Sequence, residues 1–255
     1  YLSAISTSML LQYSIGANGA LTEIGTAIAT GGSPQNIAIA KGNRYLYVAN
    51  LNGTGITQYS IEANGTLTAM PVPAVAVSNP QSITVDANGS FAYVITVANG
   101  MHIYDIGADG SLSENSLSPV ASLPGINMVI SQGSALEPKL NYAYVTNGNS
   151  DNVISHYNID AGGSLAATAT STVSLAPDPY SIAVHPSRQF AYGVAPGVTG
   201  KVGQFSIDAS SGVLSALAPA SVDAGRDTRS LAIEKAGRFV YAVNSSDGDI
   251  SQYSV

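Results

Sequence analysis

Apolar and polar residues alternate along most of this chain in short runs that are separated by glycine-containing turns. The run SITVD at residues 82–86 is typical, with the apolar Ile83 and Val85 between polar neighbours. A period of two indicates β-strands. The turns ANG, ADG and AGG provide a residue that accepts a left-handed backbone between two strands. No link is long enough for a crossover helix, so the pattern predicts antiparallel strands throughout.

The strands belong to an internal repeat. Each copy has an aromatic residue a few positions before a turn and a Leu, as in QYSIGANGAL and QYSIEANGTL, and successive copies lie 45 to 53 residues apart. A second motif, FxYVxN, precedes this anchor, and a third, PxSIAV, precedes the second. The anchors of the repeat are Tyr13, Tyr59, Tyr104, Tyr157, Phe205 and Tyr253.

Each repeat therefore holds four strands, which we call a (PxSIAV), b (FxYVxN), c (ISQYSI) and d (after GxL). A four-stranded antiparallel meander with this period is the signature of a β-propeller blade. The sequence thus predicts one all-β propeller domain over residues 1–255. The count of twenty-two strands favours six blades with three-stranded first and last members. A seven-bladed parent, of which part is missing, is the alternative.

Two stretches carry a family resemblance. YVTN stands at 144–147, and IAVHPSRQFAYG at 182–193 is similar to a blade opening of the same family. The chain resembles the YVTN-repeat and lactonase-like (6-phosphogluconolactonase-like) β-propeller family over essentially its whole length. The resemblance implies seven blades. In the members that hydrolyse sugar lactones, it implies a cluster of His, Arg and Glu in or beside the central channel.

The motifs of that enzymatic branch are not found in this sequence, which favours a protein that is not an enzyme. No Glu follows the YVxN anchors, where Leu51, Gly148 and Ser245 stand instead. His185 falls in a turn between strands a and b. We interpret the other two histidines, His102 and His156, as structural residues on strands.

Composition narrows the choice of partners. Charged residues make up 10% of the chain, the net charge is −7, and there are nine Lys plus Arg. Nucleic acid and anionic membranes attract clustered cations, so neither is an expected partner. No apolar run is long enough for membrane insertion. The first residue is Tyr1 in place of Met, which indicates either a removed leader or a fragment. Together with the low charge, the first explanation predicts an exported protein at the cell surface or in the extracellular space.

No cofactor or metal site is expected, because the chain has no Cys and no His pair at ligand spacing. The loops NGNSDN at 147–152 and NSSDGD at 244–249 offer several oxygen ligands and leave calcium as an alternative. Solvated turns are the preferred interpretation.

A small-molecule site is expected at the channel mouth, where the d–a loop meets strand a. The stretch AGRDTRS at 224–230 brings two Arg and one Asp together, and Arg can hold a carboxylate or a sugar oxygen. The alternative is an Arg–Asp pair that only satisfies charge. The candidate ligand-binding residues are Gln35, Gln81, Asp178, Tyr180, Arg226, Asp227 and Arg229.

One repeat carries an insertion. The distance from strand a to the Tyr of strand b is 10 residues in four repeats but 16 from Met128 to Tyr144. Insertions in repeat proteins map to loops on one face, which is often the binding face. Gln132, Glu137 and Lys139 are therefore candidate interaction residues, with a neutral insertion as the alternative.

Two functions follow. The first is a structural or binding module in a surface or extracellular assembly, whose edge blades pair with other copies to give a homo-oligomer or filament. Its partners would be itself, other surface proteins or polysaccharide. The alternative is a lactonase-like hydrolase that acts on a sugar lactone in the central channel. Arg226, Arg229 and Asp227 would then stabilise the oxyanion and activate water.

Overall fold

The computed structural model describes residues 1–97, 100–121, 125–131, 141–148 and 151–255. In these ranges the regular structure is β-strand, apart from one short 3-10 helix, η1 (Lys41–Asn43). Residues 1–121 and 122–255 form two compact units. Within the described ranges, no helix has the length and apolar character needed to cross a membrane.

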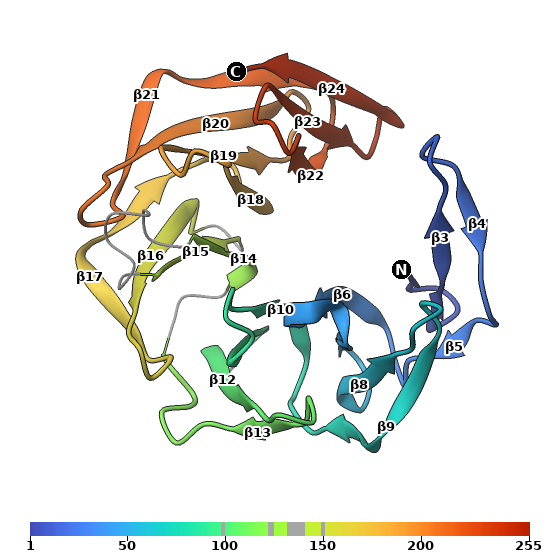
Figure 1. The fold of residues 1–255 in the computed structure, drawn as a ribbon. Helices are drawn as coiled ribbons and strands as arrows, with labels where there is room; N and C mark the ends of the chain where they lie inside the picture. Colours follow the sequence, from blue (N-terminus) through green and yellow to red (C-terminus); the bar gives the residue numbers. More distant parts are fainter. Residues whose placement is uncertain (98–99, 122–124, 132–140, 149–150) are drawn as a thin grey trace. The chain divides into compact units, whose positions relative to one another are not determined.

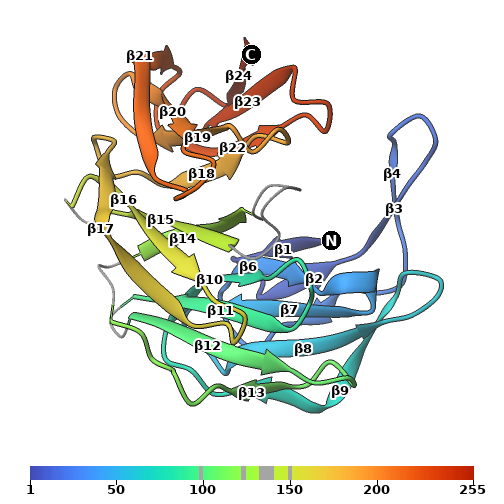
Figure 2. The same ribbon diagram turned by 60° about the vertical axis from the view of Figure 1, so that its left-hand side comes forward.

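The first unit holds two complete four-stranded sheets. One consists of β6 (Pro34–Ile39), β7 (Tyr45–Asn50), β8 (Gly55–Ile61) and β9 (Leu67–Val75), and the other of β10 (Pro80–Val85), β11 (Phe91–Thr96), β12 (Gly100–Ile106) and β13 (Leu112–Glu114). Ahead of them lie a small sheet of β1 (Leu2–Ala4), β2 (Met9–Leu11) and β5 (Ile28–Ala29), and a hairpin of β3 (Tyr13–Ile15) and β4 (Leu21–Glu23). Figure 2 shows this hairpin extending away from the other strands of its unit.

The second unit holds two four-stranded sheets and one of three strands. They are β14 (Gly125–Ser131), β15 (Asn141–Asn147), β16 (Val153–Ile159) and β17 (Leu165–Ser174); β18 (Ser181–Val184), β19 (Phe190–Ala195), β20 (Gly200–Ile207) and β21 (Leu214–Ala224); and β22 (Thr228–Ile233), β23 (Phe239–Asn244) and β24 (Asp249–Ser254). In Figure 1 the a-type strands β14, β18 and β22 of this unit follow one another, and the d-type strands β17 and β21 lie at the opposite edges of their sheets.

All strand pairs are antiparallel, and each strand pairs with its neighbours along the chain within the four-stranded sheets. One predicted repeat therefore corresponds to one sheet, and the prediction of four-stranded antiparallel blades is confirmed. Pro34 and Pro80 stand at the first position of β6 and β10, as predicted. Proline is tolerated there because a strand can begin without a backbone donor.

The described residues form twenty-four strands, where the sequence predicts twenty-two. The extra strands arise in the first repeat, where strand c is divided into β2 and β3, and strand d into β4 and β5. In the next blade an irregularity between Thr57 and Tyr59 shifts the register of β8 against β9 without ending either strand. The first repeat divides at the corresponding point, because β2 ends at Leu11 and β3 begins at Tyr13, on either side of Gln12.

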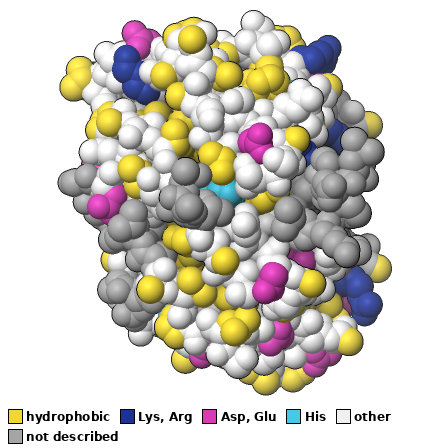
Figure 3. All heavy atoms as spheres, turned by 90° about the vertical axis from the view of Figure 1, so that its left-hand side faces the viewer, with side chains coloured by type: hydrophobic (Ala, Val, Ile, Leu, Met, Phe, Trp, Pro, Cys, Tyr) yellow, Lys and Arg dark blue, Asp and Glu magenta, His cyan; other side chains and the backbone are white. Residues whose placement is uncertain are grey.

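The core of each unit lies between neighbouring sheets. The second Tyr of strand b is fully buried at Tyr47, Tyr93 and Tyr144. Aliphatic side chains from the next sheet pack around these rings, as Ile83 and Leu112 do beside Tyr47. Charged side chains lie mainly at the surface, and Figure 3 shows those of one face. Asp86 is an exception, because it is only 5% exposed. The single domain over residues 1–255 stays a prediction, and the loop residues Gln132, Glu137 and Lys139 lie outside the described residues.

Candidate functional site

The candidate ligand-binding residues fall in both units. Gln35 on β6 and Gln81 on β10 are half-buried in the first unit. The other five lie in the second unit. Four are on the turns that lead into β18 and β22, and Arg229 is the second residue of β22. Three of these five, Tyr180, Asp227 and Arg229, are joined by direct contacts. The structure therefore collects the polar site of this unit around Arg229.

The residue before strand a has a left-handed backbone in three of the repeats. Asn79, Asp178 and Asp227 occupy the same position, directly before strand a or its Pro, and have φ values of 50°, 40° and 54°. Asn and Asp tolerate this left-handed region better than most residues. The repeat therefore imposes a sharp turn that the local sequence can accept.

Neighbouring loops hold the turn before β22 in place. The backbone N–H of Arg226 donates to Asp247 Oδ2 at 2.6 Å, and that of Asp227 donates to the Gly197 carbonyl oxygen at 2.9 Å. The Thr228 hydroxyl donates to Asn244 Oδ1 at 2.9 Å in the buried base of the turn. These bonds fix where Asp227 and Arg229 leave the backbone.

Two side chains, Asp227 and Tyr180, hold the Arg229 guanidinium in place. Its Nε donates to Asp227 Oδ2 at 2.9 Å, and its Nη1 donates to the Tyr180 hydroxyl at 2.9 Å. The guanidinium carbon lies 4.8 Å from the centre of the Tyr180 ring, as in a cation–π contact. The hydrogen bond to Asp227 is the main reason that the pKa of Arg229 is raised, so this side chain stays cationic.

Arg229 keeps donors for a ligand. Guanidinium has five N–H groups, and the contacts to Asp227 and Tyr180 use two of them. Its side chain is 46% exposed, against 25% for Asp227. The remaining donors can therefore bind a carboxylate, a phosphate or a polarised carbonyl oxygen from solvent.

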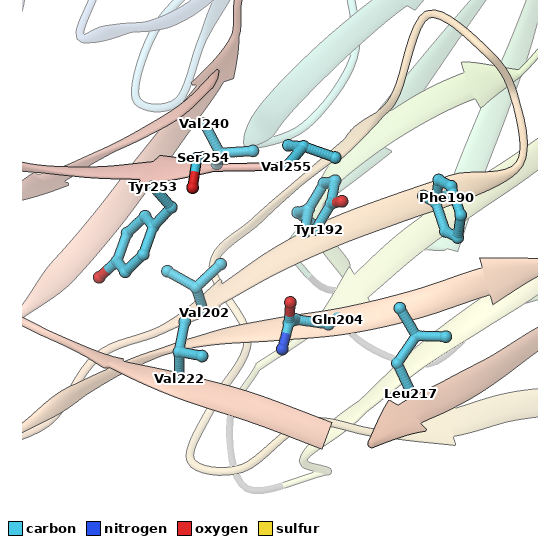
Figure 4. A pocket seen from close by; sticks show the side chains of 10 residues that line it. All are labelled: Phe190, Tyr192, Val202, Gln204, Leu217, Val222, Val240, Tyr253, Ser254 and Val255. Carbon is cyan, nitrogen blue, oxygen red and sulfur yellow. The ribbon is translucent and has the colours of Figure 1, made fainter. Parts of the chain in front are cut away.

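Arg226 and Asp178 flank this group. Arg226 is exposed, and in the part of the chain that the structure describes its guanidinium has no ion-pair partner. The Asp178 backbone N–H donates to Asn152 Oδ1 at 2.7 Å, which ties the turn before β18 to a neighbouring loop. None of these residues lines the apolar pocket between β18–β21 and β22–β24 (Figure 4).

The histidines stand apart from this cluster. His156 is almost fully buried on β16, where its ring stacks on Tyr144, and His102 lies on β12 beside Glu114. His185 lies in the turn after β18, with Nε2 2.8 Å from the Gly237 carbonyl oxygen. Among the described residues, no group of three or more His, Asp or Glu could hold a metal ion.

Asp247 is a contact of the site that the sequence analysis does not assign to it. In the sequence, Asp247 stands out only as part of the acidic loop 244–249, which suggests calcium binding. In the structure, two carboxylates of that loop already accept internal hydrogen bonds. Asp247 accepts from the Arg226 backbone, and Asp249 Oδ1 accepts from Asn244 Nδ2 at 2.7 Å.

Known proteins with a similar sequence or fold include lactonase-like β-propellers. The family model "Lactonase, 7-bladed beta-propeller" matches residues 139–255. A solved candidate 6-phosphogluconolactonase from Bacteroides uniformis ATCC 8492 superposes with a TM-score of 0.80 at 17% identity, covering 98% of this chain and 74% of its own. Residues 139–255 thus resemble the lactonase-like β-propellers, and the chain shares its β-propeller fold with these structures. The family description gives seven blades to this kind of propeller, so the predicted preference for six blades is not confirmed.

Two further solved structures share the propeller fold of this chain. A candidate 6-phosphogluconolactonase from Bacteroides fragilis NCTC 9343 has a TM-score of 0.79 at 16% identity, covering 96% of this chain and 73% of its own. The periplasmic gluconolactonase PpgL of Pseudomonas aeruginosa has a TM-score of 0.61 at 18% identity, covering 97% and 82%. No curated protein matches this chain in sequence.

Proposed function

We propose that this lactonase-like propeller hydrolyses a sugar lactone at the Arg229 cluster of its second unit. The orientation of Arg229 by Asp227 and Tyr180, with its remaining donors exposed, is the observation that carries the proposal. The family match and the gluconolactonase structures with the same fold support this class of substrate. They favour it over the structural module that the sequence predicts first. Export to the cell surface and assembly into filaments stay predictions.

The proposed reaction adds water across the ester bond of the lactone. The free N–H groups of Arg229 bind the lactone carbonyl oxygen and stabilise the negative charge that develops on it. Asp227 binds Arg229 through Oδ2, which leaves Oδ1 to accept a proton from the attacking water. The water oxygen bonds to the carbonyl carbon, the ring C–O bond breaks, and Asp227 passes the proton to the released ring oxygen.

The proposed mechanism does not need the Glu that the resemblance implies after strand b. Leu51, Gly148 and Ser245 follow strand b and provide neither an acid nor a base. The proposed chemistry uses the turn before β22, where one carboxylate and one guanidinium are already paired. Arg226, exposed three residues before Arg229, provides a second cation for a carboxylate or phosphate group of the substrate.

Hydrolysis of D-glucono-1,5-lactone and of its 6-phosphate, followed by acid release against the spontaneous rate, tests the proposal. Arg229→Ala should lower kcat/KM by about a hundredfold, which is typical for loss of an oxyanion donor. Arg238→Ala is the matched control, because Arg238 pairs with Glu234 elsewhere on the same unit. Turnover no faster than the spontaneous rate, or unchanged turnover in Arg229→Ala, would contradict the proposal.

A further inference from the structure

The turns between strands a and b share one backbone pattern. In four repeats, the carbonyl oxygen of the first turn residue accepts from the backbone N–H three positions later, and its own N–H donates to the carbonyl oxygen five positions later. These bonds measure 2.7 to 3.1 Å. The first residues of the four turns are Ala40, Asp86, His185 and Glu234. The turns therefore form a matched set in which one can be compared with the others.

The turn that begins at His185 holds a serine and a histidine in direct contact. Ser187 Oγ lies 2.7 Å from His185 Nδ1, and the Ser187 backbone N–H donates to the same nitrogen at 3.1 Å. Asp86 accepts the corresponding backbone N–H in its own turn. The residues that occupy the position of Ser187 in the other three turns are Gly42, Asn88 and Ala236. None of these has a hydroxyl, so the turn does not need one in order to form.

The neighbouring sheet fixes the tautomer of this imidazole. His185 Nε2 lies 2.8 Å from the carbonyl oxygen of Gly237, in the turn between β22 and β23. A carbonyl oxygen only accepts, so Nε2 carries the proton of the neutral ring and Nδ1 is an acceptor. The Ser187 hydroxyl is therefore the donor of its bond to Nδ1. A hydroxyl bound to a base that a third group orients is the signature of an activated nucleophile.

Close packing keeps the imidazole in this orientation. Gly237 has a left-handed backbone, and a Cβ there would lie 2.2 Å from His185 Nε2. The rings of His185 and Phe190 meet edge to face, with their centroids 6.1 Å apart. His185 is half-buried, whereas Ser187 is exposed. The base is thus held in place while the hydroxyl is open to solvent.

Arg188, the residue after Ser187, has an unusual backbone. Its φ is 61°, and the equivalent positions of two other turns hold the glycines Gly89 and Gly237. A left-handed backbone is uncommon for Arg, and strained residues of this kind cluster at functional sites. The Arg188 cation directly follows the nucleophile, where it can stabilise negative charge on an attacked carbonyl oxygen.

We propose that Ser187 is a nucleophile that accepts the acyl group of a small activated ester, with His185 as its general base. Ser187 Oγ bonds to the ester carbonyl carbon while its proton passes to Nδ1. The bond to the leaving alcohol breaks, and the alcohol takes that proton. Water then attacks the acyl-serine by the same route, which releases the acid and restores the hydroxyl. This activity is separate from lactone hydrolysis, because His185 and Tyr180 lie beyond opposite ends of β18.

Diisopropyl fluorophosphate, which phosphorylates activated serines with loss of fluoride, is the probe. Mass spectrometry of the labelled and digested full chain should find the adduct on Ser187. His185→Asp should slow labelling about a hundredfold, as for loss of a general base. This variant keeps an acceptor for the turn, because Asp86 fills the same position in another repeat. Arg188→Gly should slow labelling about fivefold, as for loss of one exposed charge.

Ser211→Ala is the matched control. Its hydroxyl is also exposed in a turn, but it donates to the Asp208 carboxylate at 2.8 Å rather than to an imidazole. Labelling of this variant should equal that of the wild type. Turnover of 4-nitrophenyl acetate gives a second measurement. Release of 4-nitrophenolate should exceed the spontaneous rate over many turnovers, and Ser187→Ala should return it to that rate.

Three results would overturn the proposal: no adduct on Ser187, an equal rate of labelling in wild type and His185→Asp, or unchanged ester turnover in Ser187→Ala. Circular dichroism shows whether each variant is folded. If His185→Asp does not fold, the position of the adduct in the unaltered protein and the turnover of Ser187→Ala still decide. Ala236 stands at the position of Ser187 in another turn, so Ser187→Ala should fold.

Discussion

The Tyr47 hydroxyl bonds to the carbonyl oxygen of Gly110, which lies 63 residues further along the chain and in the next blade. The donor is fully buried, and burial raises its pKa well above the usual value. The hydroxyl therefore stays protonated at neutral pH and can donate this bond.

Tyr47→Phe should remove this hydrogen bond and leave the Gly110 carbonyl oxygen without its donor. The free energy of unfolding should fall by about 1–2 kcal/mol, as for an unsatisfied buried group. Denaturant unfolding measures this change. Tyr13→Phe is the control, because Tyr13 is only half-buried and its hydroxyl donates no bond within the described residues. An equal loss in both variants would show that the Tyr47 bond adds nothing.

Gly110→Ala should be more costly than the same change at Gly19. Both glycines have a left-handed backbone, with φ of 81° and 82°. A Cβ at Gly110 would come within 2.3 Å of the Tyr45 ring, whereas one at Gly19 would meet nothing within 4 Å. Backbone strain of about 1 kcal/mol is common to both, and overpacking adds about 1–3 kcal/mol at Gly110 alone. Equal unfolding free energies for the two variants would contradict the close contact.

His156 should make stability depend on pH. Burial lowers the pKa of His156 to about 4, well below the usual histidine pKa of about 6.5. Well above pH 6.5 the His156 imidazole is neutral in both the folded and the unfolded chain, so it does not make stability depend on pH there. As the pH falls from 6.5 to 4, the unfolded chain binds a proton that the folded chain does not, and stability drops by up to about 3 kcal/mol. Below pH 4 the drop levels off.

His156→Gln isolates that effect, because Gln58 is the residue at the equivalent position of another repeat. The difference in unfolding free energy between wild type and this variant should change with pH in that window and be constant above it. A difference that is constant from pH 7 to pH 4 would show that His156 titrates normally.

Tyr180→Phe should lower lactone hydrolysis through Arg229. The variant keeps the ring beneath the guanidinium but removes the acceptor for Nη1. Because Asp227 still holds Nε, we expect a fall of about five- to tenfold in kcat/KM, well short of the loss in Arg229→Ala. If Arg229 is only a structural ion pair, turnover in Tyr180→Phe will equal that of wild type.

The sequence by itself determined the repeat, its period and the turns. Alternating strands and glycine turns are local properties, since a left-handed backbone at Gly110 requires only that no side chain oppose it. The sequence also placed Asp227 and Arg229 together, two positions apart on the same turn. The split of the first repeat at Gln12 escaped prediction, because it depends on where a register shift falls between paired strands.

Only the tertiary structure decided what the recurring aromatic and amide residues do. Tyr47 and Gln58 bind a turn more than fifty residues away, and Tyr180 meets Arg229 across 49 residues. Such contacts depend on how one sheet packs against the next, which local periodicity does not encode. The same packing turned Tyr192 and Gln204, ordinary members of the repeat, into the lining of an apolar pocket.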